Sequence, residues 1–426
     1  MDDFDVIIVG AGPAGSSAAY KLAEQGQQVL LLERGKSPGS KNVYGGRIYP
    51  YSLSKLIPDY KIDAPIERYV KKENIVFMTE SSSTSITYSS YRDSDKTSFT
   101  AIRSKFDEWL ANKAVDKGAT LFPEIRVDDI IIENNKVVGI KAGSDEIRAK
   151  MTIVADGATS LLSKKAGLRK DSLPDHYSIG VKEVIELSEE QIDDHFSLNP
   201  GDGSAVVYVG YPTQYMRGGA FLYTNKNTIS LGIVVKSQDL IEKKVQVGDL
   251  MNNFKKHKEI EKLFDTGKTV EYNAHLIPEA GFSMIPELYR DGLVLAGDSA
   301  GFVINNGYTF RGVDLAISSG IAAAKTFIHA NTKSDFSTKS LSVYTSYLDE
   351  YNVLIDLKKY KKGPGYMNNP RLYDDYPHLV CDLLDRIYDI NGEQRKLVRE
   401  YAQELIRGRI SISGLIKDTI GSANSL

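Results

Sequence analysis

The sequence predicts an α/β fold that combines a parallel sheet with a second, antiparallel layer and a helical C-terminal tail. Three observations predict it. The first 34 residues read as strand, glycine-rich turn, helix and strand; polar and apolar residues alternate between about 177 and 275; and apolar residues recur at helical spacing after 336. A chain of 426 residues can bury a sizeable core and divides into two or three regions.

The N-terminal segment predicts a Rossmann-like βαβ unit that binds a dinucleotide. Gly10 permits a tight turn, Gly12 lets the backbone approach a pyrophosphate, and Gly15 lets the helix pack closely on the strand. The helix N-terminus offers amide donors to phosphates. Glu33 ends the second strand, where its carboxylate accepts both ribose hydroxyls and repels a 2′-phosphate, which disfavours NADP. The expected contact residues of this unit are Gly10, Gly12, Pro13, Ala14, Gly15, Glu33 and Arg34.

Composition excludes several classes of protein. A net charge of -3 gives no electrostatic case for nucleic acid. No apolar run approaches the roughly 18 residues of a membrane span, and the first strand begins by Phe4, which leaves no room for a signal peptide. We therefore expect a cytoplasmic location, with peripheral contact at the cytoplasmic face of the membrane left open.

The cysteine and histidine content limits which disulfides, clusters and metal sites the chain can form. Cys381 is the only cysteine, so the chain forms no internal disulfide and cannot ligate an iron–sulfur cluster, which needs several thiolates. We expect Cys381 to face a helix core. The six histidines show no metal-ligand spacing, and no metal site is expected.

Two further segments favour the same ligand. In the loop Gly45-Gly46-Arg47, paired glycines allow the main chain to lie against a flat ring, although a Gly-Gly pair is also an ordinary turn. Arg103 begins a predicted helix and can form a two-pronged contact with a phosphate, although a surface arginine is the alternative. The buried side of this helix is expected to hold Phe106, Trp109 and Leu110.

Two apolar strands end in an acid beside a glycine. One ends at Asp156-Gly157, where a purely structural turn is equally plausible, and the other at Gly297-Asp298, which is followed by Asn305-Asn306-Gly307 and a long helix. A carboxylate at the carboxyl end of such a strand suits the hydroxyls of a polyol chain. Since FAD has a ribityl chain and NAD has none, the pattern favours FAD.

The order of these motifs, over residues 4 to 325, resembles the FAD-dependent oxidoreductases of the p-hydroxybenzoate hydroxylase fold. Within that superfamily, residues 39–47, 301–316 and 368–377 resemble the FixC proteins, which belong with electron transfer flavoprotein:quinone oxidoreductases. The resemblance implies electron transfer from reduced electron transfer flavoprotein through FAD toward quinone. Longer single-chain members carry a cysteine-rich ferredoxin-like region that this chain lacks, so the resemblance also implies a small ferredoxin-like iron–sulfur partner.

The resemblance also implies roles for single residues. Glu33 would bind the adenosine ribose, Arg103 the pyrophosphate, the backbone at Val127 the adenine, and Asp298 the ribityl chain. Gly307, just before the helix of residues 313–327, would lie at the pyrimidine edge of the flavin. Reduction places negative charge there, so the helix dipole would favour the reduced ring by roughly 1 kcal/mol. Electron transfer needs no general acid, base or nucleophile from the protein, and no catalytic residue is expected.

We expect four regions along the chain. Residues 1–175 form the first part of the FAD-binding domain, with an inserted segment at about 50–100 that joins the second layer. Residues 176–280 form an antiparallel-sheet substrate domain, residues 281–335 complete the FAD-binding domain, and residues 336–426 form the helical C-terminal region. An apolar slot for quinone would have Tyr211, Tyr215, Met216 and Phe221 as candidates, although ordinary packing accounts for most tyrosines.

Three alternatives remain open. The amphipathic segment 410–420 is either a membrane contact or interior packing, and we favour packing. Geranylgeranyl reductases share the fold but would carry a cysteine beside the Gly-Gly loop and a Tyr-x-Trp-x-Phe-Pro motif, whereas Tyr44 precedes the glycines here and Trp109 is the sole tryptophan. A flavin-holding assembly subunit without turnover would contain flavin but take up no electrons from electron transfer flavoprotein.

Overall fold

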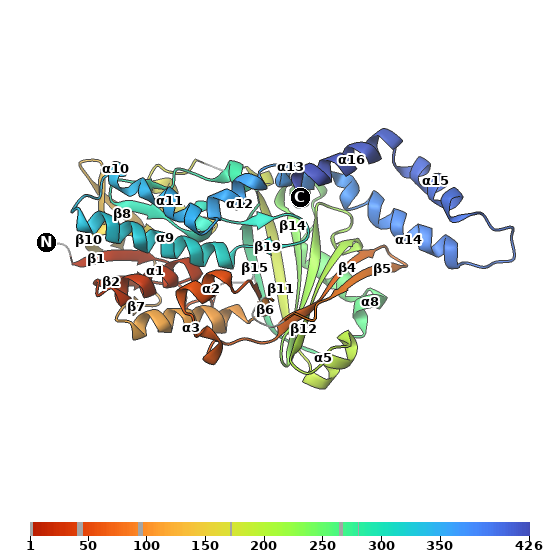
Figure 1. Ribbon diagram of the computed structural model, residues 1–426, viewed down its shortest axis with the longest axis horizontal. Helices are drawn as coiled ribbons and strands as arrows, with labels where there is room; N and C mark the ends of the chain where they lie inside the picture. The colour runs from red at the N-terminus through yellow and green to blue at the C-terminus, as the bar shows by residue number, and fades with distance from the viewer. Residues whose placement is uncertain (1–2, 41–45, 93–96, 171–172, 264–266, 280) are drawn as a thin grey trace. The chain divides into compact units, whose positions relative to one another are not determined.

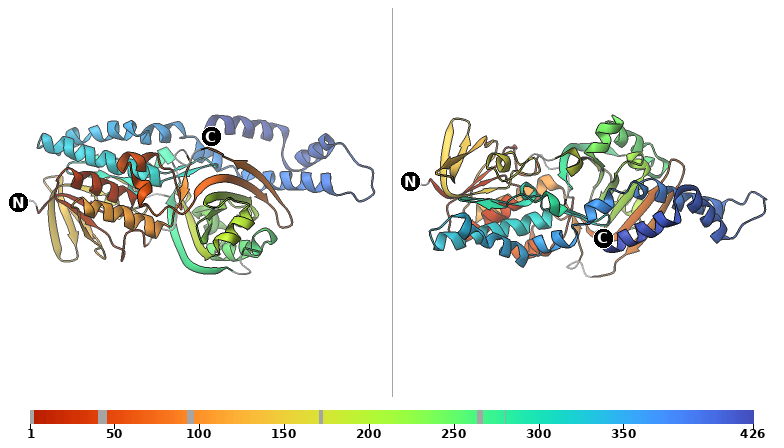
Figure 2. Two further views of the ribbon diagram at one scale, coloured as in Figure 1. Left: turned by 60° about the horizontal axis from the view of Figure 1, so that its bottom comes forward. Right: turned by 90° about the horizontal axis from the view of Figure 1, so that it is seen from above.

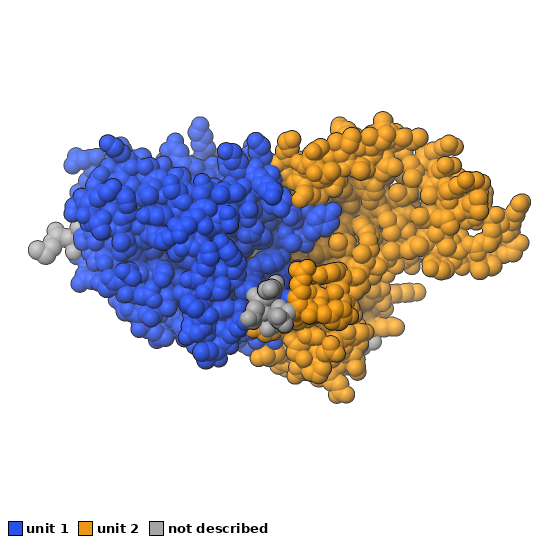
Figure 3. Space-filling view, in the orientation of Figure 1, with its two compact units in different colours: residues 1–67, 95–176, 276–361 blue, residues 68–94, 177–275, 362–426 orange. Residues whose placement is uncertain are grey.

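The computed structural model describes residues 3–40, 46–92, 97–170, 173–263, 267–279 and 281–426. The chain forms two compact units (Figure 3). Unit 1 comprises residues 1–67, 95–176 and 276–361, and unit 2 comprises residues 68–94, 177–275 and 362–426. Each unit is therefore assembled from three separate stretches of the chain.

Unit 1 is built on a largely parallel sheet. Its strand order is β16 (Tyr289–Arg290), β17 (Leu293–Leu295), β10 (Asp145–Val154), β1 (Phe4–Val9), β2 (Val29–Leu32) and β7 (Thr120–Phe122). All neighbours pair in parallel except β16 and β17. The apolar segment of β1 is buried on both faces, as parallel strands require, and this confirms the predicted α/β fold.

Helices α1 (Pro13–Glu24), α3 (Arg103–Asp116) and α9 (Val313–Thr332) pack in series beside this sheet (Figure 1). The hairpin of β8 (Asp129–Glu133) and β9 (Lys136–Ala142) lies on the face opposite α9 (Figure 2). Helices α1 and α9 approach closely because α9 has a glycine at the crossing. A Cβ added to Gly320 would lie 2.2 Å from the carbonyl oxygen of Ala14.

Shorter elements complete unit 1. After α9 the chain continues through α10 (Thr338–Leu341), α11 (Val343–Glu350) and α12 (Val353–Lys359), with Leu348 buried but Ile355 exposed. Asn352, with a φ of 59°, separates α11 from α12, so Ile355 does not continue the buried stripe of α11. The other elements are β3 (Arg47–Ile48), α2 (Tyr51–Leu56), η1 (Tyr60–Ile62), β6 (Phe99–Thr100), α4 (Leu161–Lys165), η3 (Pro174–His176), η5 (Gly281–Met284), η6 (Gly297–Ala300), β18 (Ile304–Asn305) and β19 (Phe310–Arg311).

Unit 2 is built on a curved sheet. Its order is β15 (Lys268–Pro278), β11 (Tyr177–Glu186), β14 (Thr228–Lys236), β13 (Gly218–Thr224), β12 (Asp202–Gly210), β4 (Tyr69–Met78) and β5 (Ser83–Ser89). The predicted antiparallel pairing holds for β11 with β14, β14 with β13, and β13 with β12. However, β12 pairs with β4 in parallel. Because β4 arrives from a distant stretch of chain, no hairpin fixes its direction.

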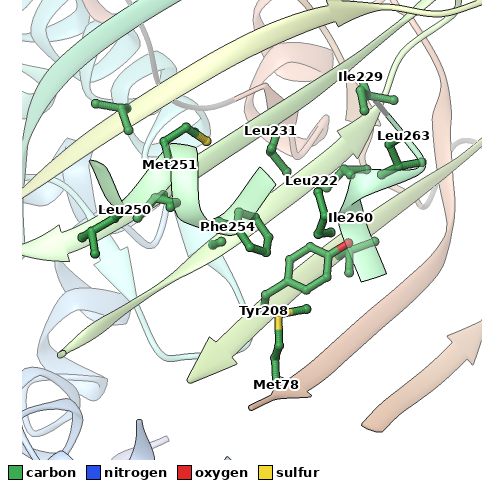
Figure 4. Close-up of a cluster of buried hydrophobic side chains, with 14 of the residues drawn as sticks. Met78, Tyr208, Leu222, Ile229, Leu231, Leu250, Met251, Phe254, Ile260 and Leu263 are labelled. Atoms are coloured by element: carbon green, nitrogen blue, oxygen red, sulfur yellow. The ribbon is translucent and has the colours of Figure 1, made fainter. Parts of the chain in front are cut away.

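One face of this sheet carries a large apolar core (Figure 4). Phe254 of α7 (Val247–Lys255) packs edge-on against Tyr208 at 5.2 Å between ring centroids. Met216 belongs to this core, and Phe221 is buried beside Tyr223. These two candidates for a quinone slot therefore serve as packing within unit 2. The other helices of unit 2 between 177 and 275 are α5 (Glu189–Phe196), η4 (Tyr211–Thr213), α6 (Ser237–Lys243) and α8 (Lys258–Glu261).

The last helices of unit 2 are α13 (Gly363–Met367), η7 (Pro370–Leu372), α14 (Asp375–Tyr388), α15 (Val398–Arg409) and α16 (Ile412–Ser425). Cys381 of α14 is buried, as expected. An ion pair holds α16 in place: Arg371 donates to both carboxylate oxygens of Asp418 at 2.6 Å, and the Tyr376 hydroxyl donates to one of them at 2.9 Å. Residues 336–361, which the helical pattern joins to this region, lie in unit 1.

The amphipathic segment 410–420 is not simply interior packing. Ile410 is buried, but Ile412, Ile416 and Ile420 are 64%, 54% and 57% exposed. Spacing by four residues places these three side chains on one side of α16. The expectation of packing is therefore wrong for this stripe. Among the described residues, no helix is both long and apolar enough to span a membrane.

Asp418→Asn should destabilise the C-terminal helices. The hydrogen bond from Arg371 lowers the pKa of Asp418 from 3.8 to about 2. Because the folded-state pKa lies below the unfolded one, the pair stabilises the fold above about pH 4 and loses this effect as the pH falls toward 2. Removing the charge should lower the free energy of unfolding by about 2 kcal/mol at pH 7. Urea titration followed by circular dichroism measures this change.

The matched control is Asp382→Asn. Asp382 pairs with Arg409 at 2.9 Å, but both side chains are about one third exposed. Solvent screening limits such a pair to about 0.5 kcal/mol. Equal destabilisation by the two substitutions would contradict a special role of the Arg371–Asp418 pair.

Candidate functional site

The parallel strands of unit 1 end level with one another. Val9 of β1 lies opposite both Leu32 of β2 and Val154 of β10, and Val154 lies opposite Leu295 of β17. The residues that follow these four strands therefore meet at one edge of the sheet, where open α/β sheets bind ligands. The sequence-predicted residues at this edge are Gly10, Gly12, Glu33, Asp156, Gly157, Gly297 and Asp298.

The turn after β1 depends on glycine. Gly10 has a φ of 103°, and a Cβ added to it would lie 2.2 Å from the carbonyl oxygen of Ala155. A Cβ on Gly15 would lie 1.9 Å from the carbonyl oxygen of Gly10. Both contacts are with backbone atoms and cannot relax cheaply. The roles predicted for these two glycines, a tight turn and close helix packing, agree with this geometry.

The N-terminus of α1 is suited to an anion. Gly12 is the N-cap residue, no side chain caps the helix, and its first turn contains no acidic residue. Pro13 and Ala14 are buried in that first turn. The amide groups and the positive end of the helix dipole thus remain available for a phosphate.

Glu33 is held in a fixed position after β2. Its Oε2 accepts a hydrogen bond from the amide of Ala11 at 3.1 Å, and its Oε1 accepts one from the amide of Gly35 at 2.6 Å. The amide of Ile125 donates to the Glu33 carbonyl at 2.9 Å, which brings the segment before Val127 alongside. The carboxylate therefore sits beside the glycine turn, where a ribose would meet it.

Arg103 is not a surface residue. Its side chain is buried at the start of α3, and its Nε and Nη2 donate to the two carboxylate oxygens of Asp107 at 2.8 and 2.7 Å. Burial lowers the pKa of the guanidinium, but the charges of Asp107 and Asp298 outweigh burial and raise it. Asp298, which lies far from Arg103 in the sequence, thus acts electrostatically on it. Sequence reasoning missed Asp107, although its i, i+4 spacing is a usable signal.

Asp156 and Gly157 are tied to the neighbouring strand end by Ser299. The Ser299 hydroxyl donates to Oδ1 of Asp156 at 2.8 Å and accepts from the amide of Gly157 at 3.0 Å. The amide of Leu162 donates to Oδ2 at 3.2 Å. Burial raises the pKa of Asp156 despite these bonds. Both carboxylate oxygens of Asp156 therefore accept hydrogen bonds within the protein, as those of Glu33 do. Ser299 was missed, although it directly follows the predicted Gly297-Asp298 pair.

The residue that follows β17 packs against the start of α1. Gly297 has a φ of 63°, and a Cβ on it would lie 2.9 Å from Cβ of Ala14. Its amide donates to the Ser319 hydroxyl of α9 at 2.9 Å. The start of α1, the end of β17 and the first half of α9 are therefore in direct contact.

The loop predicted to face a flat ring is partly described. Gly45 lies outside the described residues. The carbonyl of Gly46 accepts from the amide of Ala101 at 2.7 Å, and Arg47 pairs with Thr100 just before α3. This loop therefore lies beside the start of the helix that carries Arg103.

Three predicted residues stand apart from this cluster. Arg34 is exposed, Val127 is half-buried, and Gly307 lies in an exposed turn where its amide donates to Oδ1 of Asn305 at 3.0 Å. Among the hydrogen bonds of the described residues, none joins these three to the strand-end cluster. Over the same residues, no three acidic, histidine or cysteine side chains are grouped closely enough to hold a metal ion.

Comparison with known proteins identifies the family. Residues 3–244 match the FAD binding domain, and residues 363–426 match the ETF-QO/FixC family C-terminal domain. The chain is 41% identical over 427 residues to the probable electron transfer flavoprotein-quinone oxidoreductase YdiS of Escherichia coli K12, covering 100% of this chain and 99% of that protein. The chain belongs to the ETF-QO/FixC family. It is also 44% identical over 421 residues to protein FixC of the same organism, covering 98% and 97% of the two chains.

As a member of this family, the chain is an FAD-dependent oxidoreductase, which confirms the predicted cofactor and enzyme class. A solved structure of a geranylgeranyl bacteriochlorophyll reductase-like protein from Thermoplasma acidophilum matches with a TM-score of 0.75 at 22% identity, over 99% of this chain and 100% of that one. The flavin-dependent brominase Bmp2 matches with a TM-score of 0.65 at 20% identity, over 99% and 97% of the two chains. At such identities these likenesses show the fold alone.

Glu33→Ala and Asp298→Ala should each weaken FAD binding. Losing a charged hydrogen-bonding partner costs about 1.5 to 3 kcal/mol, which corresponds to roughly 10 to 100-fold in Kd. Titration of the FAD-free protein with FAD, followed by quenching of flavin fluorescence, measures the effect. The control is Glu24→Gln, which alters an exposed ion pair with Lys21 on the same helix α1. Wild-type affinity in both alanine variants would contradict the site.

Proposed function

We propose that this chain accepts electrons from reduced electron transfer flavoprotein and passes them through FAD to quinone. The observation that carries the proposal is full-length similarity to a protein whose name states this activity, with 100% of this chain covered. The strand-end cluster supports it, because its free amides, its turn glycines and its fixed acid suit FAD.

We further propose how FAD is held. The pyrophosphate would lie at the N-terminus of α1 near Arg103, the adenosine ribose at Glu33, and the ribityl chain at Asp298. Bound FAD supplies the electron-carrying chemistry itself. The protein contributes orientation, exclusion of water and charge, and the packing of Gly297 on Ala14 holds the Asp298 loop against the start of α1.

The single cysteine bears on whether this chain could hold an iron–sulfur centre of its own. Cys381 is buried in α14, where its thiol lies 3.4 Å from the carbonyl oxygen of Phe77. The 426 residues therefore provide no set of thiolates for a cluster. We propose that a small ferredoxin-like protein supplies it when electrons pass through such a centre.

The proposal is tested by mixing the FAD-loaded protein with reduced electron transfer flavoprotein in the absence of oxygen. The flavin of the electron transfer flavoprotein regains its absorbance as the FAD of this protein loses it, so the readout is the absorbance of a soluble quinone analogue, which should be reduced only when this protein is present. The control is the same mixture without this protein. A protein that binds FAD yet is not reduced would be a flavin-holding assembly subunit, and saturation of an isoprenoid lipid by the reduced protein would establish the reductase instead. Either result would contradict the proposal.

We also propose that α16 contacts the membrane peripherally, since quinone dissolves in lipid. The exposed side of this helix carries Ile412, Ile416 and Ile420, while its opposite side is fixed by Asp418. Each isoleucine that enters an apolar phase contributes about 1.5 to 3 kcal/mol. Changing all three to serine should therefore reduce co-sedimentation with phospholipid vesicles at least tenfold.

The matched control changes three equally apolar but scattered residues to serine. Ile62, Ile86 and Ile241 are 82%, 58% and 60% exposed and belong to different elements. This control should bind vesicles as the wild type does. Equal loss in both triple variants, or in neither, would contradict a membrane role of α16.

A further inference from the structure

A charged cluster stands at the start of α9, outside the residues assigned so far. Nε of Arg311 donates to Oδ2 of Asp314 at 2.8 Å, and Nη2 forms an ion pair with the same oxygen at 2.7 Å. Nη1 of Arg311 donates to Oδ2 of Asp356, from α12, at 2.6 Å. Asp314 is only 2% exposed, whereas the side chains of Arg311 and Asp356 are 24% and 26% exposed. The cluster therefore has a buried end and an outer end.

The helix start that carries this charged cluster lies beside the strand-end cluster. Asp314 is in the first turn of α9, and Ala316 in the same turn would lie 3.6 Å from a Cβ on Gly297. Arg311 ends β19, whose partner β18 leads into the turn that contains Gly307, for which the family resemblance implies the pyrimidine edge of the flavin. The start of α9 is therefore close to the Asp298 loop, to which we assign the ribityl chain.

The charges of this cluster oppose one another. An uncapped helix start carries about half a positive charge, and α9 has no side-chain cap on Gly312. The carboxylate of Asp314 offsets that charge, and Arg311 offsets the carboxylate. Burial raises the pKa of Asp314, while Arg311 lowers it. Within the described residues, Oδ1 of Asp314 is buried and accepts no hydrogen bond.

We propose that Arg311 and Asp314 set the reduction potential of the bound flavin by balancing the charge at the N-terminus of α9. The inference rests on the FAD site of the proposed function and not on the electron donor or acceptor, since it takes the flavin ring to follow the ribityl chain from Asp298 to this helix start. Reduction adds negative charge to the ring. A nearby cation therefore raises the potential and a nearby anion lowers it, so Arg311 and Asp314 act in opposite directions. Neither is a catalytic residue, because both act through their charge.

The experiment measures the midpoint potential of the purified FAD-loaded protein against mediator dyes by absorbance. Asp314→Asn should shift the potential to more positive values, since it removes the buried anion. Arg311→Gln should shift it to more negative values, and Arg311→Lys should restore it toward the wild-type value by restoring the charge. The affinity for FAD is measured in parallel, so that a change of potential is not confused with loss of the cofactor.

Asp356→Asn is the matched control, because it removes a carboxylate from the same arginine at the outer, solvent-screened end. Its potential should stay close to that of the wild type. Potentials for Asp314→Asn and Asp356→Asn that agree within error would overturn the proposal. Where Asp314→Asn does not fold, the two Arg311 variants decide: a shift in glutamine but not in lysine supports the proposal, and equal potentials overturn it.

The readout does not involve electron transfer flavoprotein or quinone. A protein that fails to take electrons from electron transfer flavoprotein, but whose potential shifts as described, would disprove the proposed function and support this inference. A protein that is reduced normally, but whose reduction potential does not change on Asp314→Asn, would support the proposed function and disprove this inference.

Discussion

The register of four parallel strands is the constraint on which this molecule depends. Since Val9 lies opposite Leu32 and Val154, and Val154 lies opposite Leu295, the loops after these strands are brought to one edge from positions nearly 300 residues apart. Close packing behind the edge keeps them there. Gly15 and Gly320 allow the helices to approach backbone atoms at distances that no larger residue permits. A shift of one residue in any strand would separate the acids from the amides.

Much of this edge could be predicted because its signals are local. Each strand end is an apolar run followed by glycine, by an acid or by both, and chain order alone places Glu33 and Asp298 on the same side of a parallel sheet. What could not be predicted depends on tertiary contacts. The parallel pairing of β4 with β12 joins distant segments, and the exposure of Ile412 depends on which side of α16 the Arg371–Asp418 pair holds down. Helical periodicity identifies a stripe but not its partner.

The C-terminal region also shows what helical periodicity in the sequence cannot predict. Helical spacing joins everything after residue 336 into one region, because amphipathic helices of different units look alike in sequence. In the structure the third stretch of unit 2 begins at residue 362, and the ETF-QO/FixC C-terminal domain is matched from residue 363. The family boundary thus coincides with the boundary between units. The Gly363-Pro364-Gly365 segment begins α13 there, with proline in its first turn.

Unit 1 contains the same arrangement of charged side chains at two places. Arg103 at the start of α3 faces Asp107 and Asp298, and Arg311 before α9 binds Asp314 and Asp356. In each case one guanidinium lies near two carboxylates, so the formal charge of these three side chains is minus one. These two groups therefore add no net positive charge, whereas the helix starts and main-chain amides, as at α1, do contribute positive potential. Because these backbone groups cannot titrate, such a site would hold its cofactor over a wide pH range, while its carboxylates adjust the electron affinity.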